Sequence, residues 1–180
     1  NNTVTVTNNP SATTTGGVIG INSQGLTPLL STATMSINNN TVQNCVLGGA
    51  TSTTNSLTCI VNLSRPGIMN MNSNNIINNS ITATTATTGI LLGMSNSGAA
   101  AGTVNMNSNV IRNMSSTAAS GQMQGIVNSG VVVTALNITN NQLGNASGGF
   151  FSSTVASIGS LFGIISNAGA RTYTLALTCH

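Results

Sequence analysis

Residues 68–78 read IMNMNSNNIIN and contain the pattern that decides the fold. Two apolar residues alternate with polar ones, an Asn follows the second apolar residue by three positions, and a further apolar residue comes two places later. Alternation has the period of a β-strand, with one face turned inward and the other outward. We therefore expect Met69 and Met71 to point into a core, and Asn70 and Asn72 to point outward.

Related copies of this pattern occur along the whole chain, and each ends on an Asn. They have the form apolar-any-apolar-any-any-Asn and lie at Val4, Val6 and Asn9; Met35, Ile37 and Asn40; Val104, Met106 and Asn109; and Leu136, Ile138 and Asn141. With Asn74 included, the Asn residues are 31 to 35 positions apart. A partial copy is expected at the end, with Leu175 and Leu177 as its apolar residues and His180 in the Asn position.

A repeat of this length with strand periodicity and no helical pattern predicts an all-β solenoid. We expect a parallel β-helix of about five turns of 31–35 residues, with about three strands in each turn. Equivalent strands of successive turns would then pair in parallel, roughly 4.8 Å apart. We treat residues 1–180 as one solenoid domain, which is either complete or a segment of a longer repeat protein.

Stacked turns place every repeat position above its own copies. This predicts a structural ladder of asparagines that comprises Asn9, Asn40, Asn74, Asn109 and Asn141. A second ladder is expected four residues later, at Asn44, Asn78, Asn113 and Asn145; the first copy has Thr13 there instead. Asparagine suits both ladders because its amide can donate to and accept from the next amide, and because it tolerates left-handed backbone angles at corners.

The charge content is unusually low, with no Asp or Glu and only Arg65, Arg112 and Arg171 giving a formal net charge of +3. Stacking favours this composition, since identical charges in a ladder would repel one another. The chain therefore lacks the paired carboxylates of glycosidases, the acidic ligands of calcium sites and the Asp of a catalytic triad. We predict no enzymatic activity and no cofactor. Scattered arginines do not favour nucleic-acid binding.

Few other residues carry chemistry. Cys45 and Cys59 could form a disulfide across a loop, or they could be small buried thiols; Cys179 makes the count odd. The seven methionines are expected to pack the core and not to bind metal. The only His is His180, the final residue. The apolar stretch at residues 155–165 is too short to cross a membrane.

Residues 37–44 and 71–79, each followed by a Gly-Ile-like strand, resemble the repeats of right-handed parallel β-helix proteins of the pectate-lyase-like superfamily. They are more closely similar to the Asn-, Thr- and Ser-rich repeats of long secreted or cell-surface proteins of bacteria. The resemblance implies a right-handed coil and an extracellular or cell-surface location. Enzymes of that superfamily carry Asp, Lys or Arg clusters on one outer face. This chain has no Asp, so the resemblance does not extend to their activity.

Three functions are compatible with these features. The first is a structural element of an extracellular fibre, sheath or adhesin stalk, stacking end to end on further copies or on further repeats of the same chain. The second is a module that binds polysaccharide or ice; against ice, the outward Thr3, Thr5 and Thr7 do not recur in later copies. The third, a degenerate enzyme of the same fold, would need acidic residues that this sequence lacks.

Overall fold

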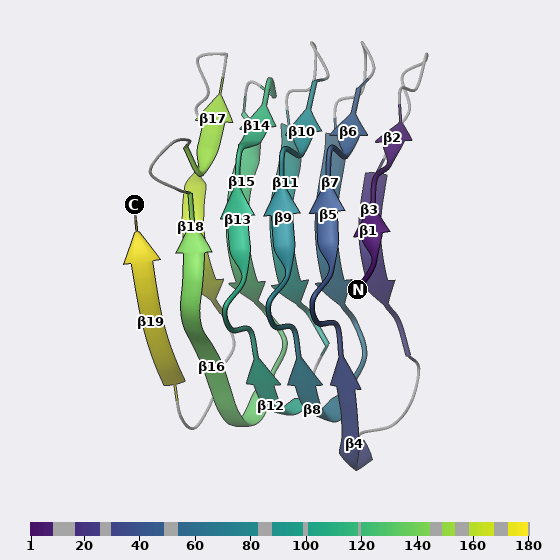
Figure 1. The fold of residues 1–180 in the computed structure, drawn as a ribbon, viewed down its shortest axis with the longest axis vertical. Helices are drawn as coiled ribbons and strands as arrows, with labels where there is room; N and C mark the ends of the chain where they lie inside the picture. Colours follow the sequence, from purple (N-terminus) through teal and green to yellow (C-terminus); the bar gives the residue numbers. More distant parts are fainter. Residues whose placement is uncertain are drawn as a thin grey trace.

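The computed structural model describes residues 1–8, 17–25, 30–48, 54–82, 88–98, 101–118, 120–144, 149–153, 159–167 and 173–179. Within these ranges every regular element is a β-strand, and neighbouring strands pair in parallel. The strands form three sheets, which we call the front, upper and rear sheets after their places in Figure 1. Each turn passes once through each of the three sheets. The predicted all-β, parallel solenoid with three strands per turn is therefore confirmed.

The front sheet is the largest, and its strands are interrupted at a corner in most turns. Its strands above the corner are β1 (Thr3–Val4), β5 (Thr41–Gln43), β9 (Asn75–Ile77) and β13 (Val110–Arg112). Its strands below the corner are β4 (Leu30–Ser36), β8 (Pro66–Asn70) and β12 (Ala101–Asn105). Two longer elements, β16 (Val132–Leu143) and β19 (Tyr173–Cys179), run through both halves.

Each of the other two sheets has five strands, one for each level of the stack. The upper sheet comprises β2 (Thr7–Asn8), β6 (Val46–Leu47), β10 (Ser80–Ile81), β14 (Met114–Ser116) and β17 (Phe151–Ser153). The rear sheet comprises β3 (Gly17–Ser23), β7 (Thr54–Asn62), β11 (Thr88–Asn96), β15 (Gln122–Asn128) and β18 (Leu161–Ser166).

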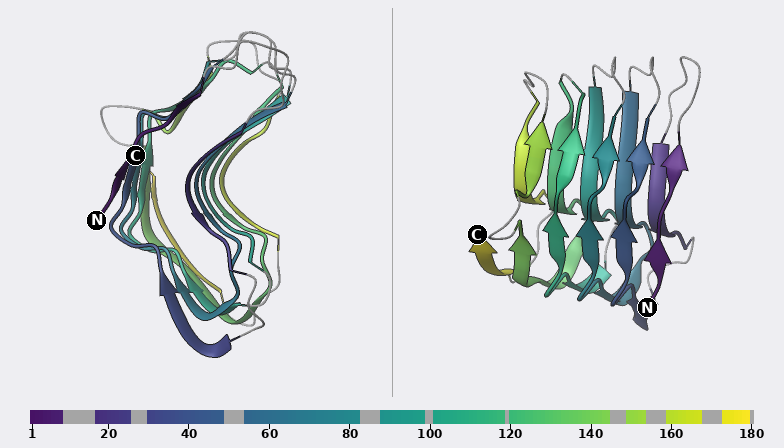
Figure 2. Two further views of the ribbon diagram at one scale, coloured as in Figure 1. Left: turned by 90° about the vertical axis from the view of Figure 1, so that its right-hand side faces the viewer. Right: turned by 45° about the horizontal axis from the view of Figure 1, so that its top comes forward.

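The coil is right-handed, as the two figures show together. In Figure 1 the front strands run upward, the rear strands run downward, and successive turns move from right to left. Viewed from the N-terminal end, the chain therefore turns clockwise as it recedes (Figure 2, left). It completes about four turns between Thr3 and Gln142, where the repeats predicted about five, through the register Thr3, Thr41, Asn75, Val110 and Gln142. Strands β17, β18 and β19 continue the stack.

The register corrects the sequence alignment at both ends of the chain. Val4 lies beside Val42 and not beside Met35, so the first turn was aligned with the wrong half of the front sheet. The cause is that the alternating run at residues 3–7 fits a strand on either side of the corner. At the other end, Leu177 lies beside Asn141, whereas the repeat pattern predicts His180 at this position. His180 itself lies outside the described residues.

Apolar side chains from the front and rear sheets fill the interior. Val42, Ile76 and Ile111 from the front sheet have no exposed surface, and neither have Leu57 and Leu91 from the rear sheet. Six of the seven methionines are buried as predicted: Met69, Met71, Met94, Met106, Met114 and Met123. Burial of such side chains supplies the main stabilisation, about 1.5–3 kcal/mol each relative to exposure.

The rear sheet bends toward the front sheet near its middle (Figure 2, left). Glycines occupy the inward position there: a Cβ on Gly93 would lie 2.6 Å from the carbonyl oxygen of Gly125 and 3.0 Å from Cδ1 of Ile111. A Cβ on Gly20 would lie 2.9 Å from Cγ1 of Val42. At these two levels the missing side chain lets the backbone of the rear sheet reach the side chains of the front sheet. Cys59, which is level with both glycines, carries a buried side chain at the same position.

Candidate functional site

A column of asparagines, buried from Asn40 onward, lies at the corner of the front sheet. It comprises Asn2, Asn40, Asn74, Asn109 and Asn141. The Nδ2 of Asn74 donates to Oδ1 of Asn109 at 3.1 Å and to the carbonyl oxygen of Ile37 at 2.8 Å, while the backbone N–H of Asn74 donates to the same Oδ1 at 2.9 Å. Asn109 repeats these contacts with Asn141 and the Met71 carbonyl. Because Asn74, Asn109 and Asn141 have no exposed surface, their amides need these partners.

Four of the five predicted members of this ladder thus lie together: Asn40, Asn74, Asn109 and Asn141. Asn9 lies outside the described residues. The position of the first turn belongs to Asn2, whose Nδ2 donates to Oδ1 of Asn40 at 3.2 Å, 38 residues further on. The later members of the column are separated by 34, 35 and 32 residues along the chain, as the sequence indicated.

The second predicted ladder is an exposed corner. Asn44, Asn78 and Asn113 have φ of 55°, 57° and 54°, the left-handed conformation that asparagine tolerates better than most residues. Nδ2 of Asn113 donates to Oδ1 of Asn78 at 3.0 Å. Asn145 lies outside the described residues. At the last level of the stack, Phe151 pairs with Met114, so the residue level with Asn113 is Phe150.

A third column, at the end of the rear strands, was not among the predicted ladders. Nδ2 of Asn62 donates to Oδ1 of Asn96, and Nδ2 of Asn96 to Oδ1 of Asn128, both at 2.7 Å. All three are fully buried, and Ser23 and Ser166 take the same position at the two ends. The signal for it was a small residue, then an apolar residue, then Asn or Ser, as at Gly93, Met94 and Asn96.

Amides also form columns on the outer face of the front sheet. Nδ2 of Asn137 donates to Oδ1 of Asn105 at 2.7 Å, and Nδ2 of Asn105 to Oδ1 of Asn70 at 2.8 Å. A neighbouring column uses the backbone: the N–H of Asn72 donates to Oδ1 of Asn38 at 2.8 Å, and that of Asn107 to Oδ1 of Asn72 at 2.8 Å. These columns are only partly buried, so solvent can also serve their polar groups.

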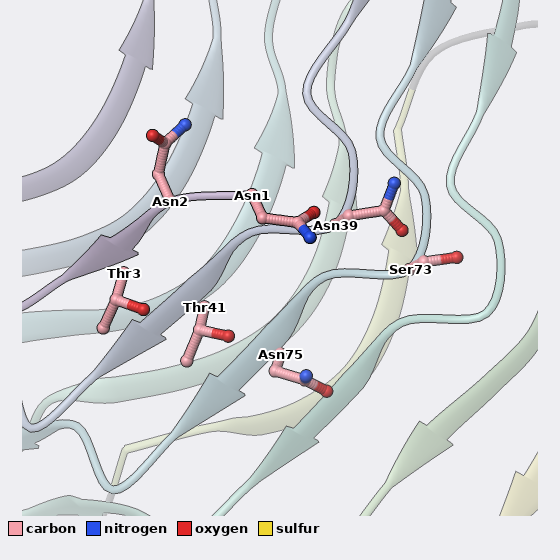
Figure 3. Close-up of a pocket in the computed structure, with 7 residues that line it drawn as sticks. All are labelled: Asn1, Asn2, Thr3, Asn39, Thr41, Ser73 and Asn75. Atoms are coloured by element: carbon pink, nitrogen blue, oxygen red, sulfur yellow. The ribbon is translucent and has the colours of Figure 1, made fainter.

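A polar hollow of about 430 Å³ lies over the corner at the N-terminal end of the front sheet. Figure 3 shows Thr3, Thr41 and Asn75 in one row across β1, β5 and β9, with Asn39 and Ser73 beside them. Within the described residues no hydrogen bond involves these five side chains, so their amides and hydroxyls are available to a ligand. The row contains Thr only at Thr3 and Thr41, since the next two residues in this register are Asn75 and Val110.

Two of the three cysteines lie in the core. Cys45 and Cys59 are free and fully buried, which decides between the two alternatives for them in favour of buried thiols. Burial raises the pKa of the Cys59 thiol well above its usual value, and the nearby Cys45 raises it further. Burial likewise raises the pKa of Cys45, against a lowering by the hydrogen bond with the Val6 backbone. The described residues contain no group of three or more His, Cys, Asp or Glu side chains that could hold a metal ion.

Within the described ranges, the outermost strands at both ends of the stack have one edge without a paired strand, and core positions there are incompletely covered. At the N-terminal end the inward residues Val4, Ile21 and Met35 are only half-buried. At the C-terminal end Leu161 continues the inward column of Met123 but is 58% exposed, against 2% for Met123. Edges of this kind can pair with a further strand.

The search for known relatives found no matching family model, curated protein or solved structure. The class of protein therefore follows from the fold alone, which is a right-handed parallel β-solenoid. Within the described ranges, no helix is long and apolar enough to cross a membrane.

Proposed function

We propose that this chain is a non-catalytic structural element of an extracellular fibre, sheath or adhesin stalk, which associates by stacking solenoid turns end to end. The observation that carries the proposal is that, among the described residues, no strand covers the outer edges of β3 and β18, and their inward residues Ile21 and Leu161 keep exposed surface. A contact between the two different ends of identical chains is heterologous, and it generates an open filament.

The composition supports the same proposal. Every inner turn is held by uncharged amide columns that can be repeated without charge repulsion, and the chain has no Asp or Glu to interrupt them. The bacterial cell-surface repeats that residues 37–44 and 71–79 resemble are the nearest model for such a role. An extracellular or cell-surface location is part of this proposal.

Sedimentation velocity and negative-stain electron microscopy of the purified chain test the idea. We expect end-to-end oligomers that dissociate on dilution. Ile21→Lys and Ile164→Lys place a charge in the same inward column at opposite ends, so each should weaken assembly. A folded chain that stays monomeric at all concentrations, and whose ends take up no added solenoid strand, would overturn the proposal.

The polar hollow supports a second candidate, polysaccharide binding. Its free amides and hydroxyls at Asn39, Thr41, Ser73 and Asn75 match the hydroxyl groups of a sugar. A glycan array compares the wild type with Thr41→Val and Asn75→Leu, which remove polar groups from the hollow. Equal signals for all three proteins would contradict binding there. A thermal-hysteresis assay tests ice binding, which the broken Thr row does not favour.

A further inference from the structure

The exposed corner between the front and upper sheets carries a modification motif in two successive turns. Residues 78–80 read NNS and residues 113–115 read NMS, and both match Asn-x-Ser, the acceptor motif for N-linked glycosylation of secreted proteins. In the stack the two motifs coincide, since their final residues pair with each other. The acceptor asparagines, Asn78 and Asn113, therefore lie one above the other.

We propose that Asn78 and Asn113 are attachment sites for an N-linked oligosaccharide. The proposal rests on the extracellular location that is part of the proposed function, and it adds a class of co-substrate, a polyprenyl-diphosphate-linked oligosaccharide. In the transfer, Nδ2 of the Asn forms a bond to the anomeric carbon of the first sugar. The bond between that carbon and the diphosphate oxygen breaks, so the lipid diphosphate leaves, and the amide releases one proton.

The folded corner leaves room for the modification. Asn78 and Asn113 are both exposed, at the left-handed turn where the chain passes from one sheet to the next. Among the described residues Nδ2 of Asn78 makes no hydrogen bond, and Nδ2 of Asn113 makes one, to Oδ1 of Asn78 at 3.0 Å. A glycosylated amide keeps one N–H, so this bond can persist after modification.

Asn62 shows that the motif alone does not select a site. It begins the same motif with Leu63 and Ser64, but its side chain has no exposed surface. Both of its amide hydrogens are used, since Nδ2 donates to the carbonyl oxygen of Ser64 at 3.0 Å and to Oδ1 of Asn96 at 2.7 Å. A glycan there would remove one of these bonds from the interior and is incompatible with the fold.

The remaining motifs of the described residues begin at Asn1, Asn39 and Asn137. Asn1 and Asn39 line the polar hollow, so a glycan on either would cover the second candidate site. Asn137 is half-buried in the outer amide column, where its Nδ2 donates to Oδ1 of Asn105 at 2.7 Å. The corner between the front and upper sheets is thus the place where motif, exposure and repetition coincide away from any other candidate site.

The preceding turn supplies a matched control at the same corner. Asn44 is exposed and has φ of 55°, as its two neighbours in the column do, but Val46 takes the place of Ser80 and leaves the motif incomplete. Val46→Ser should therefore create a third attachment site, at Asn44. Ser80→Ala and Ser115→Ala should each remove one existing site without changing an asparagine of the corner.

Secretion of the 180-residue chain from a eukaryotic cell line, behind a cleavable leader peptide, tests the sites. Enzymatic deglycosylation converts a glycosylated Asn to Asp, which mass spectrometry of peptides then locates. In the folded, secreted chain we expect glycan on Asn78 and Asn113 and none on Asn62. Ser80→Ala should lose the glycan at Asn78 only. Modification of Asn62 before folding would retain the chain in the cell, so Ser64→Ala, which lacks that motif, is expressed in parallel.

The outcomes separate this proposal from the proposed function. Folded chains with Asn78 and Asn113 unmodified, or with Asn62 modified as fully as either, would overturn the attachment sites and leave end-to-end stacking intact. The corner runs along the side of the stack and not across its ends (Figure 1), so glycans there leave stacking free. Sedimentation velocity on the same glycosylated protein tests this. A chain with glycan at the corner that stays monomeric at all concentrations would contradict stacking but not the attachment sites.

Discussion

Two columns of asparagine run along the front sheet within a few residues of each other, and they differ in almost everything but residue type. Asn74, Asn109 and Asn141 form the buried column, and Asn70, Asn105 and Asn137 the outer one. Buried amides donate toward the C-terminal neighbour and also bond the backbone of the preceding turn. Outer amides donate toward the N-terminal neighbour and remain partly exposed.

The difference shows that stacking alone does not make a ladder structurally essential. Both columns repeat at the same spacing, and both have amide–amide hydrogen bonds between turns. Only in the buried column does the removal of an amide leave its partners without water as a substitute. The comparison therefore predicts that the loss of stability on substitution depends on how deeply the amide is buried and not on how many hydrogen bonds it makes.

Asn109→Asp should have the largest effect. The carboxylate can no longer donate to the Met71 carbonyl or to Oδ1 of Asn141, and it is fully buried without a positive partner nearby in the column. We expect a loss of about 4 kcal/mol or more in the free energy of unfolding at pH 7. Urea denaturation measures it.

The loss should depend on pH. Burial raises the pKa of the new carboxyl in the folded state above its unfolded value of about 3.9, so the folded state binds the extra proton more tightly. Stability should therefore be greatest below about pH 4 and fall as the pH rises toward the folded pKa. Asn105→Asp is the control and should lose about 1 kcal/mol or less. Equal losses at the two positions would contradict the comparison.

Gly93→Ala should have the next largest effect. Glycines, like asparagines, differ in whether they lie in the interior or at the surface, and Gly93 lies in the interior. The new Cβ would lie 2.6 Å from the Gly125 carbonyl oxygen, and backbone must move to accept it. We expect a loss of about 2 kcal/mol from overpacking, measured by thermal and urea unfolding. In Gly17→Ala the nearest atom, the Ser56 carbonyl oxygen, is an ordinary 3.6 Å away, so this control should lose nothing. A similar loss in both variants would argue against a steric requirement for glycine at position 93.

Ser108→Asn should stabilise the protein. Ser108 has φ of 56°, and the equivalent residues Asn39 and Asn140 are asparagines with φ of 57° and 56°. Asparagine accepts this conformation more readily, so we expect a gain of about 0.7 kcal/mol. Differential scanning calorimetry measures it, with Ser115→Asn, in a regular strand, as the control that should show no gain. A loss of stability at Ser108 would mean that its corner is not strained.

Asn105→Ala should have the smallest effect. It removes one amide donor and one amide acceptor from the outer column, but the neighbouring groups of Asn70 and Asn137 can bond to water. We expect a change of about 0.5 kcal/mol or less in the free energy of unfolding. A loss as large as that of a buried column member would show that the outer column also holds the turns together.

Much of this architecture was predictable. Period-two alternation at Met69 and Met71 predicted inward strands, and its return every 31 to 35 residues predicted a parallel stack. The recurrent Asn then predicted the contacts among Asn40, Asn74, Asn109 and Asn141. These inferences succeeded because they depend on local geometry and on repetition, and both can be read along a single chain.

Other features depended on which residues meet across the interior. In the first turn Asn2 contacts Asn40, and the sequence did not predict this, because an alternating run such as residues 3–7 satisfies either half of the front sheet and only pairing with β5 selects one. The column at Asn62, Asn96 and Asn128 and the glycine at position 93 became understandable only with the rear sheet in place.

The sequence by itself thus determined the strands, their period and the parallel stack, since alternation and repeat length act within each turn. Tertiary structure alone decided the register of the end turns and which of two similar Asn columns is buried. The physical reason is that burial, close approach and unpaired edges are properties of neighbouring turns, and no single turn contains them.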